Sequence, residues 1–156
     1  MTRFPTSLPP DCDLRPAAET DMWAIRRLVL SAKLDPTQLR WPQFWVVTAA
    51  GKLIACGQLR NFRHAQELGS LVVISDWRGQ GIGTYLTQHL IAQATQPLYL
   101  ECLGHQLAQF YHRFGFMPVT WQQLPPALKR KFGLSHLAIT WLHLPIVIME
   151  YQGNKI

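Results

Sequence analysis

The sequence predicts a mixed α/β fold, and three observations support that prediction. An apolar run over 67–74 leads through a glycine-rich turn into a segment, 81–96, whose apolar residues recur every four positions, as in a helix. The apolar run 98–102 then fits a strand parallel to the first. Earlier in the chain, apolar runs flank the turn 49–52, as expected for an antiparallel hairpin. Strands of both orientations with helices between them predict a mixed sheet with flanking helices.

Each element has its own signal along the chain. Thr20 or Asp21 is suited to cap the first helix, which ends near Lys33. Gly115 provides the left-handed residue that ends the helix before it. The expected elements are, in order, strand 13–16, the helix ending near Lys33, hairpin strands 44–47 and 53–59, strand 67–74, helix 81–96, strand 98–102, helix 106–114 and a strand that opens at Phe116.

The C-terminal part of the chain contains a long connection. Residues 121–144 separate Val119 from the next expected strand, and spaced apolar residues within this stretch indicate helical turns. These residues are Leu128, Phe132, Leu134 and Leu137. At 156 residues the chain fits one domain, 1–156, with a core over about 13–118, a helical insertion over about 121–144 and a closing strand over about 145–151.

Composition argues against several classes of protein. Cys12, Cys56 and Cys102 show no C-x-x-C spacing, so no disulfide is predicted, and the six histidines lack a metal-binding pattern, so no metal is predicted. Met1–Pro10 has no apolar core of the kind a secretory signal needs, and we expect a cytoplasmic protein. The apolar run 137–149 is shorter than the roughly 20 residues of a membrane span, so no membrane association is expected.

The run Asp76–Thr84 carries the strongest functional signal. Gly79, Gly81 and Gly83 let the backbone adopt left-handed angles and approach a ligand closely. The following helix adds unpaired N–H groups and the positive end of its dipole, and Arg78 adds a full charge. This turn is therefore interpreted as a phosphate cradle.

The exact sequence of the turn excludes two common kinds of phosphate-binding loop. No Lys-Ser/Thr ending follows Gly83, which excludes a Walker loop. Only Ile82 separates the last two glycines, which excludes the dinucleotide fingerprint. The sequence pattern Arg78-x-x-Gly81-x-Gly83 instead resembles the signature of the GCN5-related N-acetyltransferase (GNAT) family.

A second segment strengthens this resemblance. Phe110–Phe116 is similar to the aromatic-Tyr-x-x-x-Gly-Phe motif of the family, and the resemblance covers roughly Leu14 to Phe116. It implies a mostly antiparallel, twisted sheet with a central splayed parallel strand pair. It also implies that the chain binds acetyl-coenzyme A (acetyl-CoA), whose pantetheine arm pairs with the first strand of that pair. The residues implied to bind it are Leu71, Val72, Val73, Arg78, Gly79, Gln80, Gly81, Ile82, Gly83 and Thr84.

The resemblance also implies two catalytic residues. Tyr111 matches the family's tyrosine near the coenzyme sulfur and would protonate the leaving thiolate; alternatively it only packs beside Phe110. Glu67 stands where many members place the glutamate that deprotonates the amine; alternatively it is an exposed charge at a strand end. His64, His105 and water are other candidates for the base.

Two features depart from the family pattern. Gly104 stands where many members have an asparagine that touches the cofactor arm, and the stretch 121–144 separates two strands that the family joins in a short closing hairpin. We expect this stretch to lie on the acceptor side, where the basic cluster Lys129–Lys131 would disfavour highly cationic amines; alternatively it is a stabilising cap that does not contact the substrate. That cluster is too short, and lacks stacking aromatics in step with it, to indicate nucleic-acid binding.

The function implied is transfer of acetyl from acetyl-CoA to a primary amine of a small molecule or protein, by direct attack in a ternary complex. The alternative is a non-catalytic coenzyme A-binding sensor or interaction module. The net charge of +6 fits either a solvated basic surface or attraction of an acidic ligand such as coenzyme A. The acceptor amine is left open, and both a monomer and a homodimer are compatible with the sequence.

Overall fold

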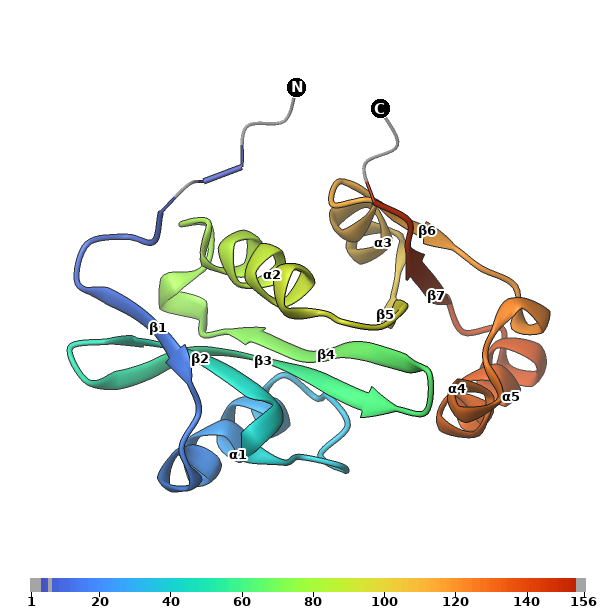
Figure 1. Ribbon diagram of the computed structural model, residues 1–156, viewed down its shortest axis with the longest axis horizontal. Helices are drawn as coiled ribbons and strands as arrows, with labels where there is room; N and C mark the ends of the chain where they lie inside the picture. The colour runs from blue at the N-terminus through green and yellow to red at the C-terminus, as the bar shows by residue number, and fades with distance from the viewer. Residues whose placement is uncertain (1–3, 6, 154–156) are drawn as a thin grey trace. The chain divides into compact units, whose positions relative to one another are not determined.

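The computed structural model describes residues 4–5 and 7–153, and so leaves part of the segment where no secretory signal is expected, residues 1–3 and 6, outside the description (Figure 1). The strands are β1 (Cys12–Pro16), β2 (Phe44–Ala49), β3 (Lys52–Phe62), β4 (Ala65–Val73), β5 (Leu98–Leu103), β6 (Phe116–Pro118) and β7 (Ile146–Tyr151). The α-helices are α1 (Met22–Ser31), α2 (Ile82–Gln93), α3 (His105–His112), α4 (Pro126–Lys131) and α5 (Gly133–Leu142).

Over the described residues, the strands form a seven-stranded sheet in the order β1-β2-β3-β4-β5-β7-β6. The pair β4 and β5 is parallel, whereas β1 with β2, β2 with β3, β5 with β7 and β6 with β7 are antiparallel. The predicted mixed sheet with a parallel pair and flanking helices is confirmed. The chain forms two compact units, each described by itself below, and the expectation of a single domain stays a prediction.

The first unit comprises residues up to 60 together with 68–93. In its core, Ile25 and Val29 of α1 pack with Phe44 and Val46 of β2, all fully or almost fully buried. The spacing of four along α1 places Ile25 and Val29 on one helix face, which explains the periodicity seen in the sequence. The hairpin β2–β3 turns at Ala50 and Gly51, whose positive φ angles of 48° and 74° match the right-handed twist of the strands.

The expected cap of α1 has a different role. Asp21 is the N-cap residue, but its carboxylate makes no bond to the α1 backbone. It accepts hydrogen bonds from Arg15 at 2.7 and 2.9 Å and from the Ala18 amide at 2.7 Å. The Arg15 guanidinium therefore holds the pKa of Asp21 below its usual value. Asp21 thus stabilises the short 3-10 turn before α1 rather than α1 itself.

The second unit comprises residues 61–67 and 94 onward. The expected helical turns between residues 121 and 144 are present as α4 and α5, and Figure 1 shows these two helices next to each other. Leu128 and Phe132 are fully buried and pack with Tyr99 of β5. Leu134 and Leu137, in contrast, are 83% and 51% exposed, because they lie on the face of α5 that is directed away from this buried cluster.

Several composition-based expectations can be compared with the described part of the chain. Cys12, Cys56 and Cys102 are free thiols. Within residues 4–5 and 7–153, no group of three or more His, Cys, Asp or Glu side chains could hold a metal ion. Nor is any helix in these residues long and apolar enough to cross a membrane.

Candidate functional site

The glycine-rich turn forms the start of α2 in the first unit. Gly79 and Gly81 have φ angles of +76° and +83°, which side chains with a Cβ rarely adopt. The Tyr85 amide donates to the Gly81 carbonyl at 2.9 Å, so the helical bonds begin here. The amides of Ile82, Gly83 and Thr84 have no acceptor within the helix and carry the positive end of its dipole. The turn therefore has the geometry of an anion cradle.

The three glycines of the turn differ in how much space surrounds them. A Cβ on Gly81 would lie 2.9 Å from Cγ of Pro5, whereas a Cβ on Gly79 would meet no atom within 4 Å. At Gly83, whose φ is not in the left-handed region, the nearest atom would be Cγ2 of Val73 at 3.6 Å, an ordinary contact. A side chain at Gly83 is therefore tolerated by the fold without backbone strain, and a charge there would lie on the first turn of α2, beside the cradle.

Arg78 connects the turn to the end of β4. Its exposed side chain donates from Nε to the Val73 carbonyl oxygen at 2.9 Å. This bond ties the cradle to the last residue of the strand segment Leu71–Val73. Arg78 thus has a structural contact in addition to the charge that the sequence indicated.

The strand segment Leu71–Val73 follows a bulge that the sequence did not reveal. Ser70, inside β4, has a φ of +50°, the left-handed angle typical of an irregular residue in a strand. Its Oγ accepts a hydrogen bond from Arg60 Nη2 at 2.9 Å and donates to Gln58 Oε1 at 3.4 Å. Gly69 leaves room for Arg60, because a Cβ there would lie 2.5 Å from Nη1.

This buried network holds the bulge in one conformation. Gln58, Arg60 and Ser70 are all at most 8% exposed, so their polar atoms are costly to leave without partners. Polar residues at alternate positions of β3, an otherwise buried strand, were the signal in the sequence that could have identified them.

Glu67 lies in the second unit and is not the exposed charge that one interpretation expected. Its side chain is 3% exposed, and Lys131 Nζ, 9% exposed, lies 3.9 Å from Glu67 Oε1. The carboxylate is the form of Glu67 that accepts a proton, and the Lys131 ammonium is placed to pair with it. The expected basic cluster Lys129–Lys131 is therefore not a surface triad, because Lys131 is directed inward.

We expect Lys131→Met to destabilise the protein by about 3 kcal/mol, the lower end for breaking a buried ion pair, since 3.9 Å is a long separation. The reason is that the methionine would remove a cation from beside a buried carboxylate. Denaturant unfolding monitored by tryptophan fluorescence measures the change. Arg130→Met, an exposed position on the same helix, is the control and should change stability by less than about 0.5 kcal/mol. Equal stabilities would mean that the pair contributes nothing.

Two further carboxylates, those of Glu101 and Glu150, lie on the same face of the sheet as Glu67. Glu67 pairs with Tyr99 across β4 and β5, and Tyr99 pairs with Glu150 across β5 and β7, so all three side chains share one face. Glu101, two residues along β5, shares that face as well. Tyr99 donates its hydroxyl to Glu150 at 3.1 Å, and burial together with this carboxylate raises the pKa of Tyr99 to about 12.

Tyr111 is a buried residue of α3. It is 8% exposed and makes edge-on contacts with Phe110 and Phe116, at ring distances of 5.1 and 5.9 Å. Burial, with a smaller effect of Cys102, raises the pKa of the Tyr111 phenol. The phenol therefore keeps its proton at neutral pH, as a proton donor must.

Gly104 departs from the family pattern for a structural reason. It is the N-cap of α3 with φ 92° and ψ 155°, a backbone conformation that is essentially restricted to glycine. Its amide donates to the Pro145 carbonyl at 2.8 Å. An asparagine at this position would be strained in this backbone conformation.

The two histidines considered as bases are both exposed. His64 lies in the turn between β3 and β4 with a φ of 62°, and His105 is the first residue of α3. A ring nitrogen of His105 lies 3.0 Å from Gln109 Nε2. Glu67 is the buried candidate among the three.

Comparison with known proteins agrees with these features. A family model described as an acetyltransferase (GNAT) domain matches residues 40–118, about half of the chain, which includes β2 to β5, the cradle, α3 and β6.

Solved structures share the fold. N-acetylglutamate synthase from Neisseria gonorrhoeae, in complex with coenzyme A and N-acetyl-glutamate, is 18% identical with a TM-score of 0.71 over 90% of this chain, which spans only 35% of that protein. An acyl-CoA N-acyltransferase from Pseudomonas aeruginosa is 20% identical with a TM-score of 0.63, covering 90% and 97% of the two chains. A GNAT family acetyltransferase from Brucella melitensis, in complex with acetyl-CoA, is 20% identical with a TM-score of 0.54, covering 68% and 82%.

Proposed function

The chain belongs to the GNAT family of acetyltransferases, and on that basis we propose that it transfers an acetyl group from acetyl-CoA to a primary amine by direct attack. The amine gives up a proton, and its nitrogen forms a bond to the thioester carbonyl carbon. The carbon–sulfur bond then breaks, and the coenzyme thiolate takes a proton. No covalent intermediate with the protein is needed.

The observation that carries this proposal is the cradle at the start of α2. Gly79 and Gly81 are left-handed, and the amides of Ile82 to Thr84 are directed at one end of the helix. Such an arrangement stabilises a pyrophosphate through geometry that is already built. Arg78 and Gln80 lie on the same turn and add polar groups from its exposed side.

Leu71, Val72 and Val73 would hold the pantetheine arm. Their backbone N–H and C=O groups would pair with its two amides, as a peptide adds to a strand edge. The left-handed angle of Ser70, an irregularity inside β4 just before them, supports this role. An N–H in this segment, aimed at the thioester oxygen, could contribute roughly 3–4 kcal/mol to the transition state.

Two side chains would move protons. Glu67 would accept the proton of the amine, and the cation of Lys131, 3.9 Å away, supports this role because it can pair with the carboxylate. Tyr111 would donate to the thiolate, since its phenol carries the proton at neutral pH.

We expect Gly83→Asp to lower the affinity for acetyl-CoA at least tenfold while leaving the fold intact. The aspartate would make an ordinary contact with Val73 and would favour the helix start, but its charge would repel the pyrophosphate. Calorimetric titration with acetyl-CoA and a thermal melt measure the two effects. Gly83→Ala is the control for size and should bind nearly as the wild type. Gly81→Asp should also weaken binding, but it would add backbone strain and a clash with Pro5, so it is the weaker test.

Release of free thiol from acetyl-CoA in the presence of a panel of primary amines tests the function itself. Turnover with at least one amine supports the transferase. Tight binding of acetyl-CoA without turnover on a broad panel of amines and peptides would instead support the non-catalytic alternative.

A further inference from the structure

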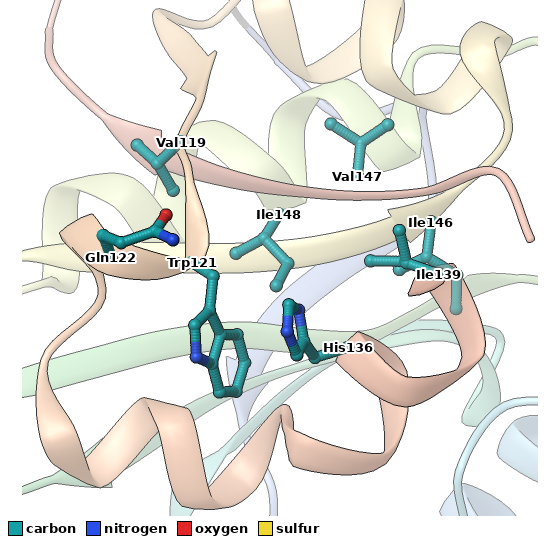
Figure 2. Close-up of a pocket in the computed structure, with 8 residues that line it drawn as sticks. All are labelled: Val119, Trp121, Gln122, His136, Ile139, Ile146, Val147 and Ile148. Atoms are coloured by element: carbon teal, nitrogen blue, oxygen red, sulfur yellow. The ribbon is translucent and has the colours of Figure 1, made fainter. Parts of the chain in front are cut away.

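A pocket in the second unit is not used by the function proposed above. It has a volume of about 380 Å³ and lies between β7 and the stretch that contains α4 and α5. Figure 2 shows Ile148 directed into it from β7, opposite the rings of Trp121 and His136, while Val147 points to the other side of the strand. Ile139 of α5 and Ile146 lie together at the far end.

The wall of the pocket is aromatic at one end and branched aliphatic at the other. The rings of Trp121 and His136 are stacked, with centroids 4.1 Å apart and planes 16° from parallel. Ile139, Ile146 and Ile148 supply the aliphatic part. Such walls bind an apolar or aromatic group, and the volume falls within the range of sites for small molecules.

A buried carboxylate oxygen lies beside this apolar wall. Glu101 is the cross-strand partner of Ile148, so the two side chains are neighbours on one face. Oε2 of Glu101 is buried and has no hydrogen-bond partner among the described residues. A buried acceptor without a partner is costly, and an ammonium group would satisfy it with a charge-assisted hydrogen bond.

The same face leads along the strands to the proposed base. Glu101 is two residues, about 7 Å, along β5 from Tyr99, which is the cross-strand partner of Glu67. An amine bound near Glu101 therefore lies on the face of the sheet that carries Glu67.

We propose that this pocket binds the acceptor and that the acceptor is a primary amine on an aromatic body, such as an arylalkylamine. The ring occupies the space between Trp121, His136 and Ile139, and the ammonium group binds Glu101. This inference rests on the proposed transferase function and names its substrate class.

The experiment compares 2-phenylethylamine with ethylamine, which has the same ammonium arm without the ring. The ratio of kcat/KM should favour 2-phenylethylamine at least 30-fold, as expected for an apolar body that fills its pocket. Ile139→Trp, which fills the pocket, should lower that ratio at least tenfold without changing the KM for acetyl-CoA. Leu137→Trp makes a similar change on the exposed face of α5 and should leave the ratio unchanged. Glu101→Gln should raise the KM for both amines.

The outcomes separate this inference from the function on which it rests. Turnover of both amines with a ratio below 3, or a ratio that Ile139→Trp does not change, overturns the acceptor pocket and leaves the transferase standing. If no amine is acetylated, the transferase proposal fails, and calorimetric titration of 2-phenylethylamine into the wild type and Ile139→Trp decides on the pocket. Binding that only the wild type shows supports the pocket, and equal or absent binding overturns it.

Discussion

Glu67→Gln should lower kcat/KM for the amine by about 10³-fold, within the range for loss of a general base. The glutamine keeps the size of the side chain but cannot accept the proton of the attacking amine. The effect should be largest at a pH where Glu67 is ionised in the wild type, because only the carboxylate can accept the proton of the amine. A pH profile of kcat/KM should therefore lose its acid limb in the variant.

The buried ion pair complicates this experiment, and a second variant resolves it. Glu67→Gln leaves the ammonium of Lys131 without this carboxylate, so part of a lost rate could reflect a disturbed fold. The double variant Glu67→Gln with Lys131→Met removes both charges and should recover stability without recovering the rate. Glu19→Gln, on an exposed turn, is the control for a lost carboxylate and should keep full activity. A variant at Glu67 that keeps the acid limb would assign deprotonation to water or to His64.

Tyr111→Phe should lower the rate of transfer by about 10²-fold while the affinity for acetyl-CoA stays unchanged. Only the hydroxyl is lost, and the phenylalanine preserves the ring contacts with Phe110 and Phe116. Single-turnover measurement of thiol release, together with calorimetric titration of acetyl-CoA, separates the two quantities. Tyr151→Phe, a half-buried tyrosine on β7, is a matched control that should leave the rate unchanged.

The raised pKa of Tyr111 adds a pH dependence with a definite sign. Because burial disfavours the phenolate, the donor remains protonated through neutral and mildly alkaline pH. The wild-type rate should therefore not fall in that range through loss of the Tyr111 proton. An unchanged rate for Tyr111→Phe would mean that this residue serves only the packing of α3.

The local features of the site could be predicted from the sequence because their signals are contiguous. A glycine at a left-handed position, as at Gly79, Gly81 and Gly115, is a requirement of a single turn and does not depend on distant residues. Helix and strand periodicities are equally short-ranged, which is why the hairpin, the turn before α2 and the parallel pair were predicted correctly. The motif around Tyr111 could be recognised for the same reason, because its residues are contiguous in the sequence.

What each side chain meets was decided only by the tertiary structure. Glu67 and Lys131 are 64 positions apart in the chain, and their pairing depends on α4 packing over β5 within the second unit. Ser70 takes a left-handed angle because Arg60 and Gln58 hold it from the neighbouring strand, which no local propensity encodes. The pocket of Trp121, His136 and Ile148 likewise combines a 3-10 turn, a helix and a strand. The hydrophobic periodicity of a segment specifies which face of the helix or strand is apolar. Which other element packs against that face depends on residues far away in the sequence, so local patterns do not determine it.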